Sequence, residues 1–495
     1  MARPNVLLFF TDQQRFDTIG ALGNGVIRTP NLDRLCGRGT AFTSAYSPSP
    51  VCVPARASML YGKYPHHSHC YENGDAMPLG DARSVMDLLS AAGYRTHGVG
   101  KCHFTPDAHA LRGFSSRETQ EEIVGDPDKD DYLRFLRTNG FDHITDPHGV
   151  RGEMYYVPQP AQMPASLHPT QWVGDRCTAF VERQQDSADP WFLFASFTHP
   201  HPPFCPPAPW HKLYRAPLMP LPKVPQQWET LLLNVNRHQN RYKYRDQGID
   251  NNLVRCMKAY YYGCISFIDM QVGRMLDALD RTGQTDKTLI LFMSDHGELL
   301  GDYNSFGKRS MHDSCARVPL LASLPGRFAE GAVCDTPVSL VDVLPTVAAA
   351  TQLDTSADEP DGVDLADVAR GDHDDRLIVS QLNKAGDAVY MALNRRWKYL
   401  YSAPDNRELL FDRVADPAET RNRASAPFVT GYATEMRTRL QQVLRDAGED
   451  VALDGDRWRE YPVKSMPLDP DAGLLVQDHP WANHRIEGYT AQTNT

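Results

Sequence analysis

Four short, strand-length runs, the first of them continuously apolar and the others similar to it, constrain the fold of this chain more than any other feature. They lie at residues 5–10, 94–99, 191–197 and 288–293. A continuous apolar run of strand length, without alternation of apolar and polar residues, is typical of a strand buried on both faces. Helical patterns lie between the runs, for example at 84–92, which begins with a Ser-x-x-Asp cap, and at 252–280. This alternation predicts an α/β fold with a large, mostly parallel sheet sandwiched by helices.

The carboxyl-terminal part of the chain has a different pattern. An acidic segment at 354–364, which we expect to be a solvated loop, precedes several short strand-like pieces and an amphipathic helix at 432–447. These pieces predict a smaller C-terminal α+β subdomain. We therefore expect a large α/β domain at 1–374, the α+β subdomain at 375–449, and a tail at 450–495 that packs on a neighbouring surface or subunit.

The charge balance excludes some classes of partner. The chain has 51 Lys and Arg against 62 Asp and Glu, a formal net charge of −11. Nucleic acids and anionic membranes are bound through basic surfaces, so we expect neither as a partner. The first apolar run is too short for a signal peptide, and no run reaches the roughly 18 residues of a membrane span. We expect a cytoplasmic protein whose ten cysteines are mostly reduced.

Polar side chains follow each of the four apolar runs, and each set contains at least one ionisable group. They are Asp12 and Gln13, Lys101 and His103, His199 and His201, and Asp295 and His296. In open α/β sheets, ligands bind beyond the carboxyl ends of the strands, so these side chains should share one site. Oxygen ligands from Asp12, Gln13 and Asp295 suit Ca²⁺ or Mg²⁺, and the nitrogen of His296 also admits Mn²⁺. The alternative is that the two aspartates only cap adjacent turns.

Cys52 lies between the first two of these strand ends. It directly precedes a predicted helix start, where backbone amides and the helix dipole favour an anion, and Arg56 follows one turn later. A thiolate nucleophile fits this position. However, the Cys-x₃-Arg spacing differs from the Cys-x₅-Arg loop of cysteine phosphatases.

These residues resemble the sulfatase family, which belongs to the alkaline phosphatase superfamily. Its signature, Cys-x-Pro-x-Arg followed by Leu-x-Gly, is matched by Cys52, Pro54, Arg56, Leu60 and Gly62. Further matches occur at 5–12, 100–103, 199–202, 294–297, 307–308, 397–399, 408–412 and 416–417. The resemblance covers residues 4–425 and implies an alkaline-phosphatase-like fold.

The resemblance implies a mechanism of sulfate ester hydrolysis. Cys52 would be oxidised to formylglycine by a maturation enzyme, and the hydrate of that aldehyde would attack sulfur. One divalent cation, Ca²⁺ first and Mn²⁺ or Mg²⁺ as alternatives, would be held by Asp12, Gln13, Asp295 and His296. Arg56, Lys101 and Lys308 would bind the sulfuryl oxygens, His201 or Lys308 would protonate the leaving alcohol, and His103 would act as base. His199 is a further candidate for substrate contact.

Two departures from the usual family pattern point to one branch. Many members have Asp where this chain has Gln13, and Asn where it has His296. The combination resembles the branch of choline sulfatases, iduronate sulfatases and phosphonate monoester hydrolases. Hydrolysis of a phosphonate monoester or phosphodiester is therefore an alternative, although the Lys and His at 101 and 103 favour the sulfatase. A pseudoenzyme that only binds sulfated ligands is a second alternative.

Several other side chains have weaker patterns. Asp302, Arg309 and His312 follow the predicted metal ligands and could contact substrate, and Cys102 should be a packed apolar residue. The tract at 65–69 contains three histidines and superficially resembles a metal-binding tract, but it lacks additional ligands, so we expect an exposed loop at the pocket rim rather than a zinc site. We expect a small sulfated substrate. A homo-oligomer, in which Trp481 or Tyr489 reaches the pocket of a neighbouring subunit, is a further possibility.

Overall fold

The computed structural model describes residues 3–124, 126–151, 154–243 and 250–467. An eight-stranded sheet in the order β10-β2-β9-β7-β1-β6-β4-β5 forms its centre. The strands are β1 (Asn5–Asp12), β2 (Thr40–Phe42), β4 (Arg95–Gly100), β5 (Ser116–Thr119), β6 (Trp191–Pro200), β7 (Thr288–Ser294), β9 (Leu320–Ser323) and β10 (Ala332–Cys334). Strands β7, β1, β6, β4 and β5 are parallel, whereas β9 runs antiparallel to β7 and β2. The predicted mostly parallel sheet is confirmed.

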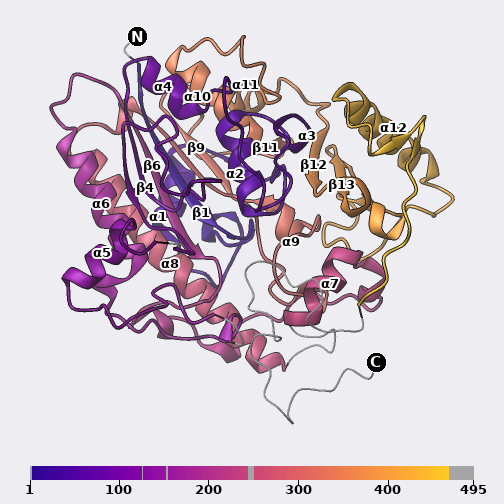
Figure 1. Cartoon of the computed structure of the whole chain (residues 1–495), viewed down its shortest axis with the longest axis horizontal. Coiled ribbons are helices and arrows are strands. Elements are labelled where there is room, and N and C mark those ends of the chain that lie inside the picture. Colours follow the sequence, from indigo (N-terminus) through magenta and orange to yellow (C-terminus); the bar gives the residue numbers. More distant parts are fainter. Residues whose placement is uncertain (1–2, 125, 152–153, 244–249, 468–495) are drawn as a thin grey trace.

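Helices cover both faces of this sheet, as Figure 1 shows. On one face, α2 (Cys52–Tyr61), α4 (Val85–Ala91), α10 (Val343–Thr351) and α11 (Leu365–Ala369) pack with Val6, Leu8 and Phe10 of β1. On the other, α1 (Pro30–Arg38), α5 (Asp131–Thr138), α6 (Pro169–Arg183) and α8 (Asn251–Arg281) pack with Leu7 and Phe9. Because successive side chains of a strand point to opposite faces, two covered faces require the continuous apolar run.

The helix signals of the sequence correspond to real caps. Ser84 and Asp87 form a reciprocal capping box at the start of α4, in which each side chain accepts a hydrogen bond from the other residue's backbone N–H. Helix α8 begins after Asp250, whose carboxylate accepts hydrogen bonds from the backbone N–H groups of Asn252 and Leu253. Both helices match the predicted ranges closely.

The C-terminal part of the chain forms a separate four-stranded antiparallel sheet (Figure 1). Its strands are β12 (Ile378–Leu382), β13 (Val389–Leu393), β14 (Trp397–Ser402) and β15 (Arg407–Asp412), and α12 (Thr430–Asp446) packs on it. A hairpin of β16 (Leu453–Asp454) and β17 (Arg457–Trp458) follows, and the Trp458 ring stacks on Tyr401 with centroids 4.2 Å apart. The α+β character of this region is confirmed. Trp481 and Tyr489 lie outside the described residues.

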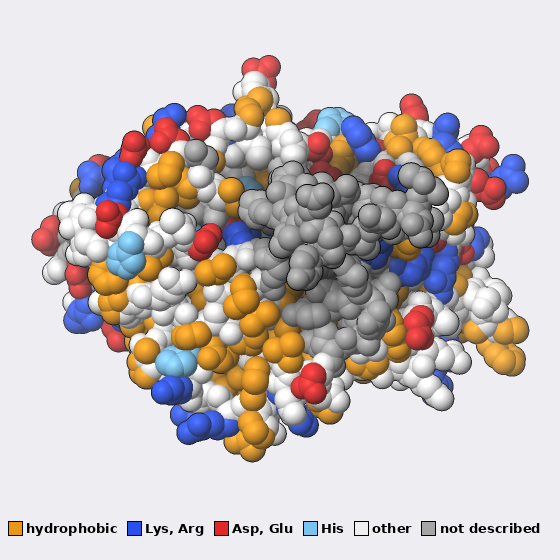
Figure 2. Space-filling view, turned by 60° about the horizontal axis from the view of Figure 1, so that its bottom comes forward, with side chains coloured by type: hydrophobic (Ala, Val, Ile, Leu, Met, Phe, Trp, Pro, Cys, Tyr) orange, Lys and Arg blue, Asp and Glu red, His pale blue; other side chains and the backbone are white. Residues whose placement is uncertain are grey.

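Smaller elements complete the described chain. A three-stranded sheet contains β3 (Ala45–Tyr46), β8 (Arg317–Val318) and β11 (Val338–Ser339), and the remaining α-helices are α3 (Pro65–Ser68), α7 (Asn234–Lys243) and α9 (Asp313–Ala316). Within the described ranges, no helix combines the length and the apolar character that crossing a membrane requires. Figure 2 shows acidic and basic side chains interspersed around the edge of one face, with apolar side chains gathered across its lower part.

Candidate functional site

The carboxyl ends of four adjacent parallel strands meet at one edge of the large sheet. Strand β1 lies between β6 and β7, and β4 pairs with the far side of β6. Most of the polar residues at these strand ends are therefore brought together, whereas His199 lies in a separate cluster. The side chains of Asp12, Lys101, Asp295 and His296 are fully buried there.

Cys52 is the first residue of α2 and is also fully buried. The preceding residue, Val51, gives the helix no side-chain cap. Instead, the side-chain oxygen of Asn73 accepts a hydrogen bond from the backbone N–H of Val53 at 3.0 Å. All ten residues of α2 are buried, so packing on every side fixes the direction in which Cys52 points.

Four buried side chains form a compact group of metal-binding type. One ligand atom from each of Asp12, Cys52, Asp295 and His296 lies within 4.8 Å of the others. The backbone of Gln13 is held beside them, because its N–H donates to Asp295 Oδ1 at 3.0 Å, and its side-chain Oε1 is buried without a hydrogen-bond partner among the described residues. An unsatisfied buried oxygen on the residue that follows Asp12 fits a hard divalent cation.

The two carboxylates differ in their electrostatic environments. Burial and the nearby Asp12 carboxylate raise the pKa of Asp295. Burial also acts to raise the pKa of Asp12, but Lys101, His201 and Arg56 outweigh it and lower that pKa. Two close carboxylates in a dry site need positive charge to stay ionised, which a bound cation provides.

Two buried cations contact these carboxylates. The Arg56 guanidinium lies 3.2 Å from Asp12 and 3.2 Å from Asp295, and it stacks over the Phe10 ring at 4.8 Å. Lys101 Nζ lies 2.6 Å from Asp12 Oδ2. Two of the three sequence-predicted cations, Arg56 and Lys101, thus contact the carboxylates of the candidate metal site.

Lys308 contacts the thiol directly. Its Nζ donates to Cys52 Sγ at 2.8 Å and lies 2.9 Å from Nε2 of His201. Burial acts to raise the pKa of Cys52, but Lys308, Lys101 and His296 hold that pKa well below its ordinary value. The position therefore favours an anion at residue 52.

His201 is neutral in this environment. Burial lowers its pKa to about 4, in spite of the opposing effect of Glu122. Its Nδ1 lies 2.7 Å from the carbonyl oxygen of Pro202, which is an acceptor, so the proton belongs on Nδ1. The Nε2 atom then accepts a hydrogen bond from Lys308.

Backbone strain accompanies the site. Gln13, His103 and Arg309 have φ values of 69°, 55° and 63°, in the left-handed region that non-glycine residues seldom adopt. Such residues gather where a site over-determines the backbone. The His103 ring hydrogen-bonds Cys52, which contributes to the low pKa of that thiol, so this predicted base does lie beside it.

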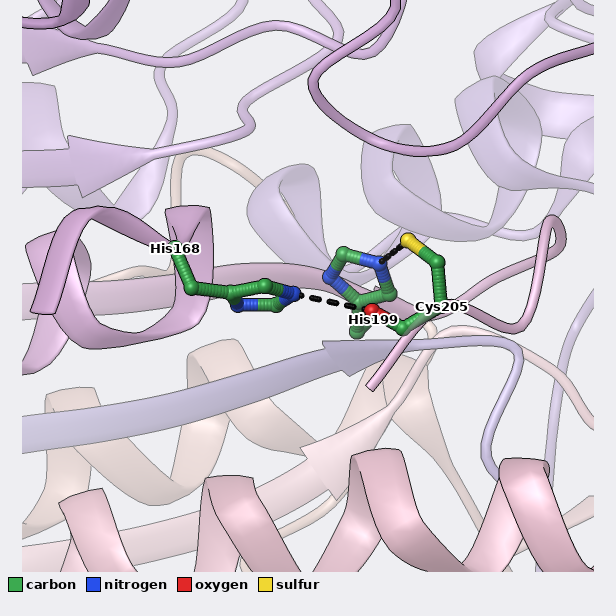
Figure 3. Close-up of side chains that lie close together, drawn as sticks. All are labelled: His168, His199 and Cys205. Carbon is green, nitrogen blue, oxygen red and sulfur yellow. Dashed lines mark hydrogen bonds between the residues drawn. The ribbon is translucent and has the colours of Figure 1, made fainter. Parts of the chain in front are cut away.

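His199 belongs to a different, closed cluster, shown in Figure 3. Its Nε2 lies 3.4 Å from Cys205 Sγ, and its Nδ1 lies 3.4 Å from the Thr170 hydroxyl. His168 Nδ1 accepts from the backbone of Thr170, and its Nε2 lies 3.1 Å from the carbonyl oxygen of Cys205. Cys205 Sγ donates to the carbonyl oxygen of His148. Both ring nitrogens of His199 have partners within the protein, which favours a structural role for this residue.

Other singled-out residues also have internal partners. Asp302 binds Arg15 at 2.9 Å, and His312 stacks on Tyr303 with centroids 4.2 Å apart. Cys102 is buried in the apolar core, as predicted. Arg309 is 5% exposed.

Sequence reasoning missed two buried acids. Glu122 contacts Lys101, lies 2.6 Å from the Arg151 guanidinium and is 3.4 Å from His201. Glu298 accepts hydrogen bonds from the Gln13 side chain and from the Tyr156 hydroxyl. Glu298 directly follows Asp295-His296-Gly297 at the end of β7, so its position in the sequence could have identified it as a candidate site residue. Glu122 follows β5, whose sequence Ser-Arg-Glu-Thr gives no strand signal.

Comparison with protein families fits this geometry. A family profile described as Sulfatase matches residues 4–353, which is most of the chain. The chain belongs to the sulfatase family. A second profile, described as N-sulphoglucosamine sulphohydrolase, C-terminal, matches residues 301–446.

Named sulfatases are similar to this one over most of their length. An arylsulfatase of Clostridium perfringens is 30% identical over 488 residues, covering 94% of this chain and 99% of the relative. A choline-sulfatase of Rhizobium meliloti is 30% identical over 452 residues, covering 86% of this chain and 83% of the relative. This sulfatase is therefore a sulfuric ester hydrolase.

Solved structures share its fold. The phosphonate monoester hydrolase of Agrobacterium radiobacter has a TM-score of 0.79 at 24% identity, covering 90% of this sulfatase and 96% of that chain. The alkaline-phosphatase-like architecture that the sequence predicted is confirmed.

Proposed function

We propose that this sulfatase hydrolyses the sulfate monoester of a small organic alcohol or phenol, with a nucleophile made from Cys52. The observation that supports this proposal is the environment of Cys52. Its buried side chain contacts Lys308 and lies next to Asp12, Asp295 and His296. Water replaces the alcohol on sulfur overall, so the products are the free alcohol and sulfate.

A modified side chain and a cation complete the site in this proposal. Formylglycine made from Cys52 by a maturation enzyme supplies an oxygen nucleophile once hydrated, and a divalent cation supplies positive charge beside it. Asp12, Asp295, His296 and the Oε1 of Gln13 would hold the cation. Three oxygen-bearing ligands favour Ca²⁺, and Mn²⁺ or Mg²⁺ are the alternatives.

Lys308 is the better of the two predicted proton donors. It has protons to give at Nζ, whereas the neutral His201 keeps its single proton on Nδ1, bound to Pro202. In our proposal Lys308 protonates the leaving oxygen, and His201 orients the Lys308 ammonium through the 2.9 Å contact. His103 accepts the proton that must leave the nucleophile as sulfate is released.

Arg56 and Lys101 would neutralise charge on the sulfuryl oxygens. Both are held in place before substrate arrives, Arg56 by the carbonyl oxygen of Lys101 at 2.7 Å and Lys101 by Asp12. Fixed cations in a buried site stabilise developing charge without reorganising.

The discriminating experiment compares two esters with the same leaving group. We expect kcat/KM for 4-nitrophenyl sulfate to exceed that for 4-nitrophenyl methylphosphonate, with enzyme produced alongside a formylglycine-generating enzyme. Faster cleavage of the phosphonate would instead assign this sulfatase to phosphonate monoester hydrolysis, the reaction named for the Agrobacterium structure. No turnover of either ester by fully modified protein would favour a ligand-binding pseudoenzyme.

The alcohol half of the substrate is the finer part of the proposal. Choline sulfate, aryl sulfates and sulfated mono- or disaccharides are the candidates, and choline sulfate is the substrate named for the Rhizobium relative. A panel of these esters with detection of free sulfate identifies the preferred class by its highest kcat/KM.

A further inference from the structure

Three side chains outside the catalytic site form a second group of metal-binding type. They are His66 and His67 of α3 and Asp361 of the acidic segment, and one ligand atom of each lies within 4.8 Å of the other two. The expectation of an exposed loop without further ligands at 65–69 is wrong in two respects. His66 is only 1% exposed, and the chain returns about 300 residues later to place Asp361 within 4.8 Å of it and in contact with His67.

His66 is the buried member of this group. Its Nδ1 is buried and has no hydrogen-bond partner within the described part of the chain. A buried polar atom without a partner is costly, and a metal ion would satisfy it.

Asp361 is held by several contacts rather than free in solvent. Its Oδ2 accepts from the backbone N–H of Tyr64 at 2.7 Å, and its carboxylate lies 2.8 Å from Nδ1 of His67. Its own backbone N–H donates to the carbonyl oxygen of Gly62 at 2.8 Å. The Lys63 ammonium donates to the carbonyl oxygen of the adjacent Glu359. The loop around Asp361 is thus fastened to the chain that leaves α2.

We propose that His66, His67 and Asp361 bind a divalent transition metal of the Zn²⁺ class in a structural site at the C-terminal end of α2. The site ties the helix that carries Cys52 and Arg56 to the segment at 354–364. Water completes the coordination shell, because His67 is partly exposed, with 40% of its side-chain surface accessible.

The donor set distinguishes this site from the catalytic one. Two imidazoles and one carboxylate are typical ligands of Zn²⁺, whereas the carboxylate and amide oxygens around Cys52 suit harder cations. A cation here also lies near the C-terminal end of α2, which ends at Tyr61 with Gly62 as its C-cap, where the helix dipole favours positive charge.

The test counts bound Zn²⁺ in matched histidine variants of the full chain. Each protein is stripped with a chelator, dialysed against Zn²⁺ in a buffer that contains Ca²⁺, and analysed for zinc per chain. His67→Ala removes a proposed ligand. His69→Ala removes a histidine from the same tract that lies outside the cluster and contacts Tyr71. Zinc held elsewhere cancels in the comparison.

We expect the His67→Ala variant to bind one Zn²⁺ fewer per chain than the wild type and the His69→Ala variant. Zn²⁺ should also raise the unfolding temperature of these two proteins but not that of His67→Ala. Asp361→Asn, which keeps the shape of the side chain, should lose the same Zn²⁺ and covers the case in which His67→Ala fails to fold. Equal zinc content in all four proteins would overturn the proposal. The measurement does not depend on catalytic activity.

Discussion

At the residue scale, the contacts of Lys308 and His201 support the different roles that we propose for them. The sequence predicts either residue as the proton donor, and both lie near the Cys52 thiol. The imidazole is neutral, with its proton directed to Pro202, and it accepts a hydrogen bond from the Lys308 ammonium. The pair therefore has one donor facing the site, and that donor is the lysine.

Replacing Lys308 with alanine should slow the hydrolysis of poor leaving groups most. An alkoxide needs a proton as the ester bond breaks, so we expect kcat to fall on the order of 10²–10⁴-fold for an alkyl sulfate. The loss should be smaller for 4-nitrophenyl sulfate, whose leaving group is stable as an anion. The measurement is kcat/KM across esters with different leaving-group pKa values.

His201→Ala is the matched variant for this prediction. It removes the orienting contact but leaves the donor, so its rate loss should depend less on the leaving group. A Lys308→Ala loss that is equal for all esters would contradict the assignment of Lys308 as proton donor.

At the scale of elements, the site depends on how closely β4 and β6 approach. Gly100, the last residue of β4, has φ of 94°, and a Cβ there would lie 1.9 Å from the carbonyl oxygen of Ser196 in β6. Glycine is needed on both counts, because the backbone is left-handed and the space is filled. This close approach sets the start of the segment that carries Lys101 and His103.

Gly100→Ala should destabilise the fold much more than Gly93→Ala. Gly93 has φ of 87°, but no described heavy atom lies within 4 Å of the Cβ position, so its variant should cost only the backbone strain of about 1–2 kcal/mol. We expect at least about 3 kcal/mol for Gly100→Ala, because the clash adds to a similar strain. Urea unfolding measures both. Equal losses would show that β4 can shift away from Ser196.

The sequence anticipated the elements that have strong local signals. Apolar runs identified β1, β4, β6 and β7, a capping pattern located α4, and helical spacing of apolar residues located α8. The polar residues at the strand ends could be grouped because parallel strands end at one edge. Glu122 was missed because β5 is a short polar strand at the sheet edge. Asp361 was missed because its contacts with α3 join segments far apart in sequence.

At the scale of the whole molecule, a buried charge cluster joins the C-terminal sheet to the large α/β region. Lys398 of β14 is fully buried, and its Nζ lies 2.8 Å from Asp313 of α9 and 2.6 Å from Glu419. Burial acts to raise the pKa of Asp313, but Lys398, Arg317 and Arg413 hold that pKa well below its ordinary value. Removing the lysine leaves two buried carboxylates short of positive charge.

Lys398→Met should lower the free energy of unfolding by about 3–5 kcal/mol at neutral pH. The lowered pKa of Asp313 contributes stability that is complete above the unfolded value near 4 and is lost as pH falls below it. The difference between wild type and variant should therefore be largest at neutral pH and should narrow below about pH 4.

Lys287→Met is the matched control, because Lys287 is exposed. Its effect should stay within about 0.5 kcal/mol at every pH. Denaturant unfolding at several pH values gives all three curves. A gap that widens toward acid for Lys398→Met would contradict the account of this cluster.

The most direct test of the central claim relates activity to the chemical state of residue 52. Preparations made with increasing amounts of a formylglycine-generating enzyme are analysed for the fraction of Cys52 converted, by peptide mass spectrometry, and for sulfate release from an aryl sulfate. We predict that turnover per chain rises in proportion to the converted fraction and extrapolates to zero for unmodified cysteine. Full sulfate release by protein that retains the Cys52 thiol would contradict the account.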